Sequence, residues 1–377
     1  MSTPATISWI DQGREHTAMW SSANSEPAPR HVVSVDDTLG ADEAYRLATA
    51  GTSMLFTGDY HNARQLLGAI ARRIPTGTKP KRKAAAATTA ERFYKYRQAR
   101  THRARVLSRL LVPMAEGPLV TLRRAPDVSE AWTNAFGPVS GPTAVSLREL
   151  LGAIGAQQWR TSGLYVGALD AKIHPHYGTF APVRGEYLDL VAGAQLPSSA
   201  RAFDIGTGTG VLAAILAKRG IAEVVGTDSQ ARAVACATQT FASLGLAGTA
   251  HAVECDMFPE GLAGLIVCNP PWLPGTPQTL LDYAVYDPKS AMLRAFLNGL
   301  PGHLEVGGQG WLVISDLAER LGLRSREELL DWIERAGLVV LGREDTRPVH
   351  GRAFDAADPF HIERSSEITS LWKLGVA

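Results

Sequence analysis

The sequence predicts an α/β fold in which a helical N-terminal domain precedes a doubly wound sheet of seven strands. From residue 200 onward, short apolar strands alternate with helices, which is typical of a parallel sheet covered on both faces. Before residue 115, apolar residues recur at helical spacing instead. The strands are expected at 201–205, 223–226, 250–254, 265–268, 310–315, 339–341 and 370–374.

These patterns divide the chain into three expected parts. They are a helical substrate-recognition domain over 1–115, a connector over 116–195, and the α/β domain over 196–377. Within the connector, apolar residues alternate through 163–178, which predicts a short β-hairpin.

The bulk composition is that of an ordinary globular protein. Hydrophobic residues make up 45% of the 377 residues, and the formal net charge is only +1, so total charge favours no class of partner. No stretch approaches the roughly 18 apolar residues of a membrane span, and the N-terminus lacks the apolar core of an export signal. The three cysteines have neither zinc-ligand nor disulfide-framework spacing. We expect a cytoplasmic protein with no membrane contact and no metal site.

Two helices are expected in the N-terminal domain. The first has four apolar residues on one face: Ala63, Leu66, Leu67 and Ile70. The second begins at Thr88, which has capping-box spacing with Glu91.

Basic residues dominate the segment 72–109. It contains thirteen lysines and arginines and one acidic residue, Glu91. Such a run could follow phosphates, and the interleaved Phe93, Tyr94 and Tyr96 could stack on bases, so a nucleic-acid contact is one interpretation. The alternative is a loop at 79–87 followed by a solvated helix face, because charge blocks often only solvate a surface.

A glycine-rich turn follows the first strand of the α/β domain. After Asp204 and Ile205 the turn reads Gly206, Thr207, Gly208, Thr209 and Gly210. Glycines let such a turn take positive φ angles and let a ligand approach the backbone. The spacing is GxGxG, because Val211 stands where a dinucleotide site would have its third glycine. This difference favours S-adenosylmethionine over NAD as the cofactor. The residues expected to bind it here are Asp204, Gly206, Thr207, Gly208 and Gly210.

Acidic residues follow the next two strands. Asp228 comes about twenty positions after the glycines, as needed to bind two ribose hydroxyls by charge-assisted hydrogen bonds. Asp256 follows the third strand and could accept a hydrogen bond from the adenine amino group. The alternative for Asp228 is that it caps the next helix.

The fourth strand is followed by Asn269, Pro270, Pro271 and Trp272. Ligands of a doubly wound sheet bind beyond the carboxyl ends of strands where the strand order reverses, so Asn269 is expected to face the methyl group of the cofactor. The Asn269 side-chain oxygen and the Pro270 carbonyl could each accept one N–H of a planar nitrogen, and Trp272 could lie against its flat face. We predict these four residues as the catalytic site; the alternative is a simple turn.

Two of these segments resemble class I S-adenosylmethionine-dependent methyltransferases. FDIGTGTG over 203–210 and LIVCNPPW over 265–272 are similar to the amino-methyltransferase group, which includes the release-factor glutamine methyltransferases and the small-domain ribosomal RNA guanine and DNA adenine methyltransferases. The resemblance covers about 163–377. It implies a Rossmann-like sheet whose last strand is antiparallel, and methylation of an amide or exocyclic amino nitrogen.

A further likeness lies before the glycine-rich turn. In the glutamine methyltransferases a hairpin leads into a Pro-Arg-Pro-Glu-Thr-Glu segment near the cofactor, and here the hairpin is followed by APVRGE over 181–186. The likeness implies that Arg184 and Glu186 lie near the methionine end of the cofactor. Gly185 replaces the second proline and Tyr187 stands where threonine is usual, which weakens the glutamine assignment. Alternatively, Arg184 and Glu186 form a surface ion pair.

Together these expectations describe an S-adenosylmethionine-dependent N-methyltransferase that acts on a macromolecule. The basic segment favours RNA or a ribosome-associated substrate, and a translation factor is the other macromolecule considered. The alternatives are a small-molecule N-methyltransferase, a non-catalytic RNA-binding protein that keeps the cofactor fold, and a nicotinamide-dependent oxidoreductase, which Val211 disfavours.

Overall fold

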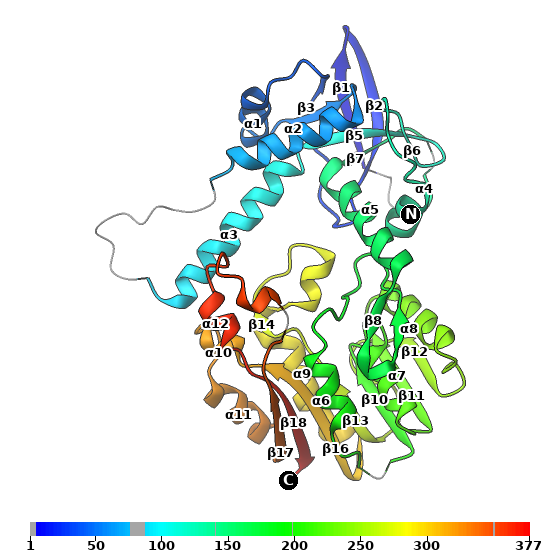
Figure 1. Ribbon diagram of the computed structural model, residues 1–377, viewed down its shortest axis with the longest axis vertical. Helices are drawn as coiled ribbons and strands as arrows, with labels where there is room; N and C mark the ends of the chain where they lie inside the picture. The colour runs from blue at the N-terminus through cyan, green and yellow to red at the C-terminus, as the bar shows by residue number, and fades with distance from the viewer. Residues whose placement is uncertain (1–4, 76–86, 140, 198, 350) are drawn as a thin grey trace. The chain divides into compact units, whose positions relative to one another are not determined.

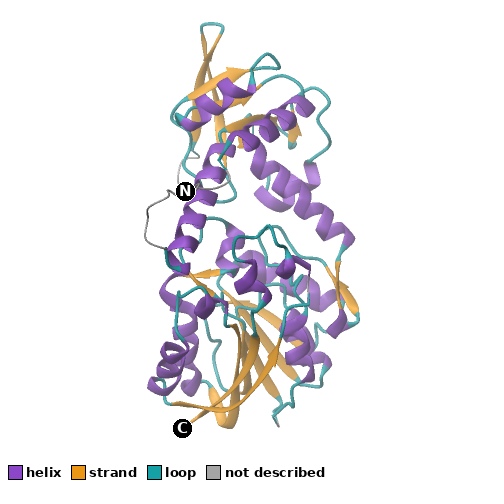
Figure 2. Cartoon of the chain, turned by 60° about the vertical axis from the view of Figure 1, so that its left-hand side comes forward, coloured by secondary structure: helices purple, strands orange, loops and turns teal. Residues whose placement is uncertain are grey.

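The computed structural model describes residues 5–75, 87–139, 141–197, 199–349 and 351–377. The chain divides into two compact units, Met1–Gln158 and Trp159–Ala377. Each unit contains both helices and strands (Figures 1 and 2). Among the described residues, no helix is both long enough and apolar enough to span a membrane.

The N-terminal unit is built on a seven-stranded sheet in the order β1-β2-β7-β5-β4-β3, with β6 paired to β5. The strands are β1 (Thr6–Asp11), β2 (Arg14–Ser21), β3 (Val32–Val35), β4 (Ser53–Phe56), β5 (Leu110–Ala115), β6 (Leu119–Val120) and β7 (Thr143–Ser146). The helices are α1 (Ala41–Thr49), α2 (Tyr60–Arg73), α3 (Thr89–Leu107), α4 (Ser129–Phe136) and α5 (Leu147–Ser162), which crosses the boundary between the units.

The N-terminal domain was predicted to be helical, and this prediction is wrong because the N-terminal unit contains a seven-stranded sheet. The two expected helices are nevertheless present. α2 buries Ala63, Leu66 and Ile70. α3 begins at the expected capping box, in which Thr88 Oγ1 accepts from the Glu91 amide at 3.2 Å and Glu91 accepts from the Thr88 amide at 2.9 Å. The sheet was missed in part because β3, β4 and β7 have only four residues each. All four residues of β4 are buried, so no alternation marks that strand.

The C-terminal unit contains the predicted doubly wound sheet of seven strands, in the order β12-β11-β10-β13-β16-β18-β17 (Figure 1). Its strands are β10 (Arg201–Ile205), β11 (Glu223–Asp228), β12 (Ala250–Glu254), β13 (Ala263–Cys268), β16 (Leu304–Ser315), β17 (Leu338–Thr346) and β18 (Thr369–Val376). The pairs from β12 through β16 are parallel, and β18 is antiparallel to both β16 and β17, as expected for the last strand.

Helices pack on both faces of this sheet. The helices of this unit are α6 (Glu186–Gly193), α7 (Val211–Lys218), α8 (Ala231–Ser243), α9 (Ala291–Gly299), α10 (Leu317–Arg320), α11 (Arg326–Arg335) and α12 (His361–Ser365). Because successive side chains of a strand point to opposite faces, Leu265 and Val267 of β13 pack in one core with α6, α7 and α8, whereas Ile266 and Cys268 pack in the other with α9 and α11. The near-continuous apolar sequence of β13 reflects burial on both faces.

The predicted β-hairpin before the sheet is also present. β8 (Leu164–Val166) pairs antiparallel with β9 (Ala171–Ile173). A second pair, β14 (Leu273–Pro274) and β15 (Tyr286–Asp287), lies in the connection after β13. The loop from residue 269 therefore leads directly into β14.

Candidate active site

The glycine-rich turn and the Asn-Pro-Pro-Trp loop begin side by side at one edge of the C-terminal sheet. β10 and β13 are adjacent and parallel, and their register pairs Ile205 with Cys268. Gly206 and Asn269 are therefore the next residues on two neighbouring strand ends. The chain continues from β10 to β11 on one side while β13 lies on the other, which makes this the switch point where ligands bind in such sheets.

The three glycines of the turn all have positive φ, with 73° at Gly206, 56° at Gly208 and 79° at Gly210. Their surroundings differ. A Cβ on Gly210 would lie 3.0 Å from Cα of Ala237 and 2.8 Å from the Phe241 ring, whereas a Cβ on Gly208 would meet no atom closer than 4.0 Å. Gly210 thus permits close packing against α8, and Gly208 leaves the backbone open to a ligand.

Replacing Gly210 with alanine should therefore cost more stability than the same change at Gly208. Both variants carry the strain of a positive φ, but only Gly210→Ala also overpacks the contact with α8, and overpacking costs roughly 1–3 kcal/mol. Urea unfolding of the two variants measures the difference. Equal losses of unfolding free energy would show that the contact with α8 is not tight.

Asp204 is buried and supports the glycine-rich turn through two hydrogen bonds. Its Oδ2 accepts hydrogen bonds from Thr207 Oγ1 at 2.7 Å and from the Ala213 amide at 3.0 Å. Burial raises the pKa of Asp204 to about 6, although both hydrogen bonds oppose this rise. The predicted contact of Asp204 and Thr207 with the cofactor stays a prediction. In the structure, their hydrogen bond helps to hold the turn in its shape.

The raised pKa of Asp204 predicts a pH-dependent stability difference between the wild type and Asp204→Asn. Between pH 3.8 and about 6 the folded protein keeps a proton on Asp204 that the unfolded chain has lost, so the contribution of Asp204 to stability falls as the pH rises and then stays constant. An asparagine oxygen can accept both bonds made to Oδ2 without any charge.

The free energy of unfolding of Asp204→Asn, relative to that of the wild type, should accordingly rise by up to about 3 kcal/mol between pH 4 and pH 7. Urea unfolding of both proteins at pH 4, 5.5 and 7 measures this difference. A difference that does not change with pH would mean that Asp204 ionises as freely in the folded protein as in the unfolded chain.

Asp228 lies at the end of β11 and contacts the turn directly. Its Oδ2 accepts from the Gly208 amide at 3.1 Å, and its Oδ1 accepts from the Gln230 amide at 3.0 Å. The alternative of a helix-capping role is not realised, because the residue before α8 is Gln230 and no side chain caps that helix. Burial raises the pKa of Asp228. The register of β11 and β12 pairs Asp228 with Glu254, so Asp256 follows at the same edge, where it is exposed.

The Asn269 side chain is held by two aromatic residues. Its Oδ1 accepts a hydrogen bond from Trp272 Nε1 at 2.8 Å, and a second side-chain hydrogen bond joins it to Tyr187. The Tyr187 and Trp272 rings meet edge to face, with centroids 6.5 Å apart and planes at 87°. Pro270 is buried, whereas Pro271 and Trp272 keep part of their surface exposed. The loop is therefore more than a plain turn, because its polar side chain is oriented.

A small cavity opens beside Trp272, with a volume of about 10 Å³, room for roughly one water molecule. It is lined by Arg184, Glu186, Tyr187, Trp272, Pro348 and Thr369. The structure thus brings Arg184 and Glu186 of the 181–186 segment to the Asn-Pro-Pro-Trp loop. Their contact with the methionine end of the cofactor stays a prediction.

Arg184 and Glu186 each bind the C-terminal part of the chain. Arg184 Nη1 lies 3.3 Å from Oε2 of Glu367, which is 1% exposed. Glu186 Oε1 accepts from the Val349 amide at 2.7 Å. These contacts anchor the start of α6 to the segment between β17 and β18.

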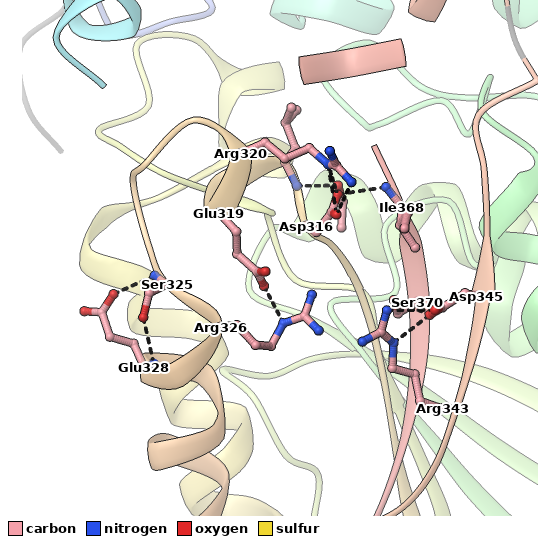
Figure 3. Close-up of polar contacts among 12 residues, drawn as sticks. Asp316, Glu319, Arg320, Ser325, Arg326, Glu328, Arg343, Asp345, Ile368 and Ser370 are labelled. Carbon is pink, nitrogen blue, oxygen red and sulfur yellow. Dashed lines mark hydrogen bonds and ion pairs between the residues drawn. The ribbon is translucent and has the colours of Figure 1, made fainter. Parts of the chain in front are cut away.

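Polar contacts also hold the end of β16 and the start of β18 (Figure 3). Asp316, directly after β16, accepts from the Ile368 amide at 2.8 Å and pairs with Arg320 at 2.8 Å. Asp345 accepts from Ser370 Oγ at 2.7 Å. The start of β18, which carries the cavity residue Thr369, is thus held by hydrogen bonds on both sides.

Comparison with known proteins finds a family that is similar to part of the C-terminal unit. Residues 189–323 match the family described as Methyltransferase small domain. This segment of the chain is therefore similar to that family. The glycine-rich turn, Asp228, Asp256 and the Asn-Pro-Pro-Trp loop all lie within the matched range, whereas Arg184 and Glu186 lie before it.

Two curated relatives are similar in sequence to part of this chain. The release factor glutamine methyltransferase of Cereibacter sphaeroides is 30% identical over 171 residues, covering 41% of this chain and 59% of the relative. The ribosomal RNA small subunit methyltransferase C of Chromohalobacter salexigens is 36% identical over 119 residues, covering 31% of this chain and 32% of the relative. The chain thus spans less than two thirds of either relative.

Solved structures of methyltransferases align with about half of the chain. Ribosomal protein L11 methylase from Lactobacillus delbrueckii subsp. bulgaricus has 16% identity and a TM-score of 0.35, and the alignment covers 50% of this chain and 76% of that one. An S-adenosylmethionine-dependent methyltransferase from Geobacter sulfurreducens, in complex with S-adenosylhomocysteine, has 17% identity and a TM-score of 0.36, with 51% and 90% covered.

Proposed function

We propose that this protein is an S-adenosylmethionine-dependent N-methyltransferase that acts on an amide or exocyclic amino nitrogen of a macromolecule. The observation that carries the proposal is the adjacency of Gly206 and Asn269 on two paired parallel strands. One strand end has a backbone open to a ligand at Gly208, and the other has an oriented amide oxygen. Donor and acceptor sites on neighbouring strand ends are what a direct methyl transfer needs, because such a reaction depends mainly on positioning.

The residues of the turn fit S-adenosylmethionine as the cofactor. Gly208 leaves open space where a side chain would stand, and the Asp228 carboxylate lies against the same turn, where it could bind the ribose hydroxyls. Asp256, at the next strand end, could bind the adenine amino group. When bound, the cofactor supplies a methyl group on a positively charged sulfur, the electrophile of the reaction.

The Asn-Pro-Pro-Trp loop would hold the acceptor nitrogen by its hydrogens. A carbonyl oxygen has two lone pairs, so Asn269 Oδ1 can accept an N–H of the acceptor while it keeps its bond from Trp272. The Pro270 carbonyl could accept the other N–H. The exposed part of Trp272 is available to a flat acceptor group.

Helix α3 supports a nucleic acid, above all RNA, as the macromolecule. Its exposed basic side chains include Arg92, Lys95, Arg100 and Arg105, and the neighbouring Tyr94 is 54% exposed. Arg103, in contrast, donates to the Ala71 carbonyl at 2.7 Å, so this side chain helps to hold α3 in its unit. The basic cluster at 79–83 lies outside the described residues, and so does most of the loop considered at 79–87.

The names of the curated relatives specify two macromolecular substrates, a release factor and ribosomal RNA. We propose RNA first and a translation factor second. A cytoplasmic location accords with either substrate and with the three free thiols, Cys236, Cys255 and Cys268.

Methyl-labelled cofactor tests the proposal directly. The purified protein is incubated with the cofactor and with separate RNA, protein and small-molecule fractions of a cell extract, and labelled RNA or protein is digested and analysed by mass spectrometry. We expect label on an exocyclic amino group of an RNA base; label on a protein amide nitrogen would keep the reaction and change the substrate. Label only on small molecules, on carbon or on oxygen, or no label at all, would contradict the proposal.

A further inference from the structure

We propose that Tyr187 is a positioning residue whose hydroxyl holds the Asn269 carboxamide in the orientation that presents Oδ1 to the acceptor nitrogen. This inference rests on the N-methyl transfer proposed above. The residue belongs to neither the glycine-rich turn nor the Asn-Pro-Pro-Trp loop, and it lies before the range that matches the methyltransferase small domain.

Tyr187 is buried, its ring packs against Trp272, and its hydroxyl is the polar group of its side chain. It is the second residue of α6 and is 4% exposed, and its ring packs edge to face on Trp272. A side-chain hydrogen bond joins it to Asn269. A buried tyrosine hydroxyl usually finds a hydrogen-bond partner, and here that partner is the predicted catalytic amide.

The orientation of the amide decides whether Asn269 can act. The last torsion of an asparagine side chain has broad, nearly two-fold preferences, so the side chain alone does not favour Oδ1 over Nδ2 at a given place. A flipped amide would present N–H groups to the N–H groups of the acceptor and could not hold it. Trp272 Nε1, a donor only, contacts Oδ1 and fixes one side of the amide, and Tyr187 fixes another.

Tyr187 has a firmer anchorage than Trp272. Trp272 belongs to the same loop as Asn269, so the two could move together. Tyr187 belongs to α6. The start of this helix is held by the Glu186 bond to the Val349 amide and, two residues before it, by the Arg184–Glu367 pair. The hydroxyl of Tyr187 thus links the Asn269 amide to a helix that is held independently of the loop.

Proton transfer is not the role assigned to Tyr187. Burial raises the pKa of its hydroxyl further above the usual range, and the nearby Asp204 adds to this effect. The hydroxyl therefore stays protonated at every pH at which the protein would work. A positioning role predicts that the pH profile of methyl transfer keeps its shape when the hydroxyl is removed.

Tyr187→Phe is the direct test, since it removes the hydroxyl and keeps the ring. Tyr165→Phe is a matched control, because Tyr165 is 60% exposed and bonds to Asp170 at 2.6 Å, outside the catalytic loop. The first measurement needs no substrate: the Trp272 indole N–H is followed in a ¹⁵N spectrum, with Trp272→Phe used to assign its signal. We expect Tyr187→Phe to shift this signal and to speed its hydrogen exchange, and Tyr165→Phe to leave it unchanged.

The second measurement is kinetic. Loss of one hydrogen bond that orients Asn269 should lower kcat about tenfold without altering the shape of the pH profile, while the dissociation constant of S-adenosylhomocysteine stays within about twofold. A merely structural role would lower the melting temperature of Tyr187→Phe and leave kcat and the indole signal at wild-type values, and that result would overturn the proposal. Should the variant not fold, fast exchange of the Trp272 indole hydrogen in the wild-type protein would overturn it instead.

The two proposals can fail separately. If the wild type transfers no methyl group to any nitrogen, the proposed function fails, and the indole measurement still shows whether Tyr187 and Trp272 share the Asn269 amide. If the wild type methylates nitrogen but Tyr187→Phe matches it in both measurements, only the positioning role fails.

Discussion

Replacing Asn269 with alanine should nearly abolish methyl transfer while the protein still binds its cofactor. The variant loses the side-chain oxygen that would accept an N–H of the acceptor nitrogen, and loss of a group that stabilises a transition state costs on the order of 10²–10³ in rate. Transfer of labelled methyl groups to the substrate identified above measures the rate. Isothermal titration with S-adenosylhomocysteine measures the cofactor affinity separately, and we expect it to change little.

Asn298→Ala is the matched control for this variant, because Asn298 is exposed on α9 and lies outside the Asn-Pro-Pro-Trp loop. Asn269→Ala also leaves Trp272 Nε1 and the Tyr187 hydroxyl without their partner, which costs roughly 1–3 kcal/mol of stability. Rates are therefore compared at a temperature at which unfolding curves show both variants folded. Wild-type turnover in folded Asn269→Ala would exclude the proposed catalytic role.

Replacing Asp228 with alanine should weaken cofactor binding by roughly 100-fold or more. The carboxylate would provide two hydrogen bonds to ribose hydroxyls, each worth about 1.5–3 kcal/mol because the acceptor is charged. It also holds the Gly208 amide at 3.1 Å, so the variant loosens the turn that the cofactor must approach. Titration calorimetry with S-adenosylhomocysteine measures the dissociation constant.

Asp256→Ala provides the comparison for Asp228→Ala. Asp256 follows the neighbouring strand, is exposed, and would contribute a single hydrogen bond to adenine, so we expect its loss to weaken binding less than the loss of Asp228 does. If both variants bind S-adenosylhomocysteine as the wild type does, the ribose does not lie at the end of β11. If Asp256→Ala has the larger effect, the cofactor lies in another orientation along the edge.

The α/β domain could be predicted from the sequence because each of its strands has a distinct local pattern. β13 is an apolar run followed by Asn269, β10 is a short strand followed by the glycine-rich turn, and helices separate most of the strands. The N-terminal sheet could not be predicted in the same way. β3 and β4 have four residues each, and they lie on either side of α1 in a segment whose helical spacing dominates the pattern.

The candidate site shows the same division between local and long-range information. The glycine-rich turn and the Asn-Pro-Pro-Trp loop are continuous in sequence, so their spacing could indicate a function. Tyr187, Pro348 and Thr369 come together only through the packing of α6 and β18, and no local pattern links them. The departure from the usual threonine at Tyr187 was visible in the sequence, but its contact with Asn269 needed the structure.

A further limit concerns the direction in which a polar side chain points. The sequence placed Asp204 at the end of a strand beside the predicted cofactor, yet Asp204 is buried and its Oδ2 supports Thr207 and the Ala213 amide. The sequence likewise assigned the Asn269 oxygen to the acceptor, whereas Trp272 already uses one of its lone pairs. Residue type and strand position predict where a group lies, but its hydrogen-bond partners follow from packing.

A crystal structure of the protein with S-adenosylhomocysteine tests the central claim most directly. We predict that the ligand lies over the glycine-rich turn, with its ribose on Asp228 and its sulfur directed toward the space beside Asn269 Oδ1. A ligand bound elsewhere, or a sulfur directed away from Asn269, would contradict the claim that β10 and β13 present methyl donor and acceptor side by side.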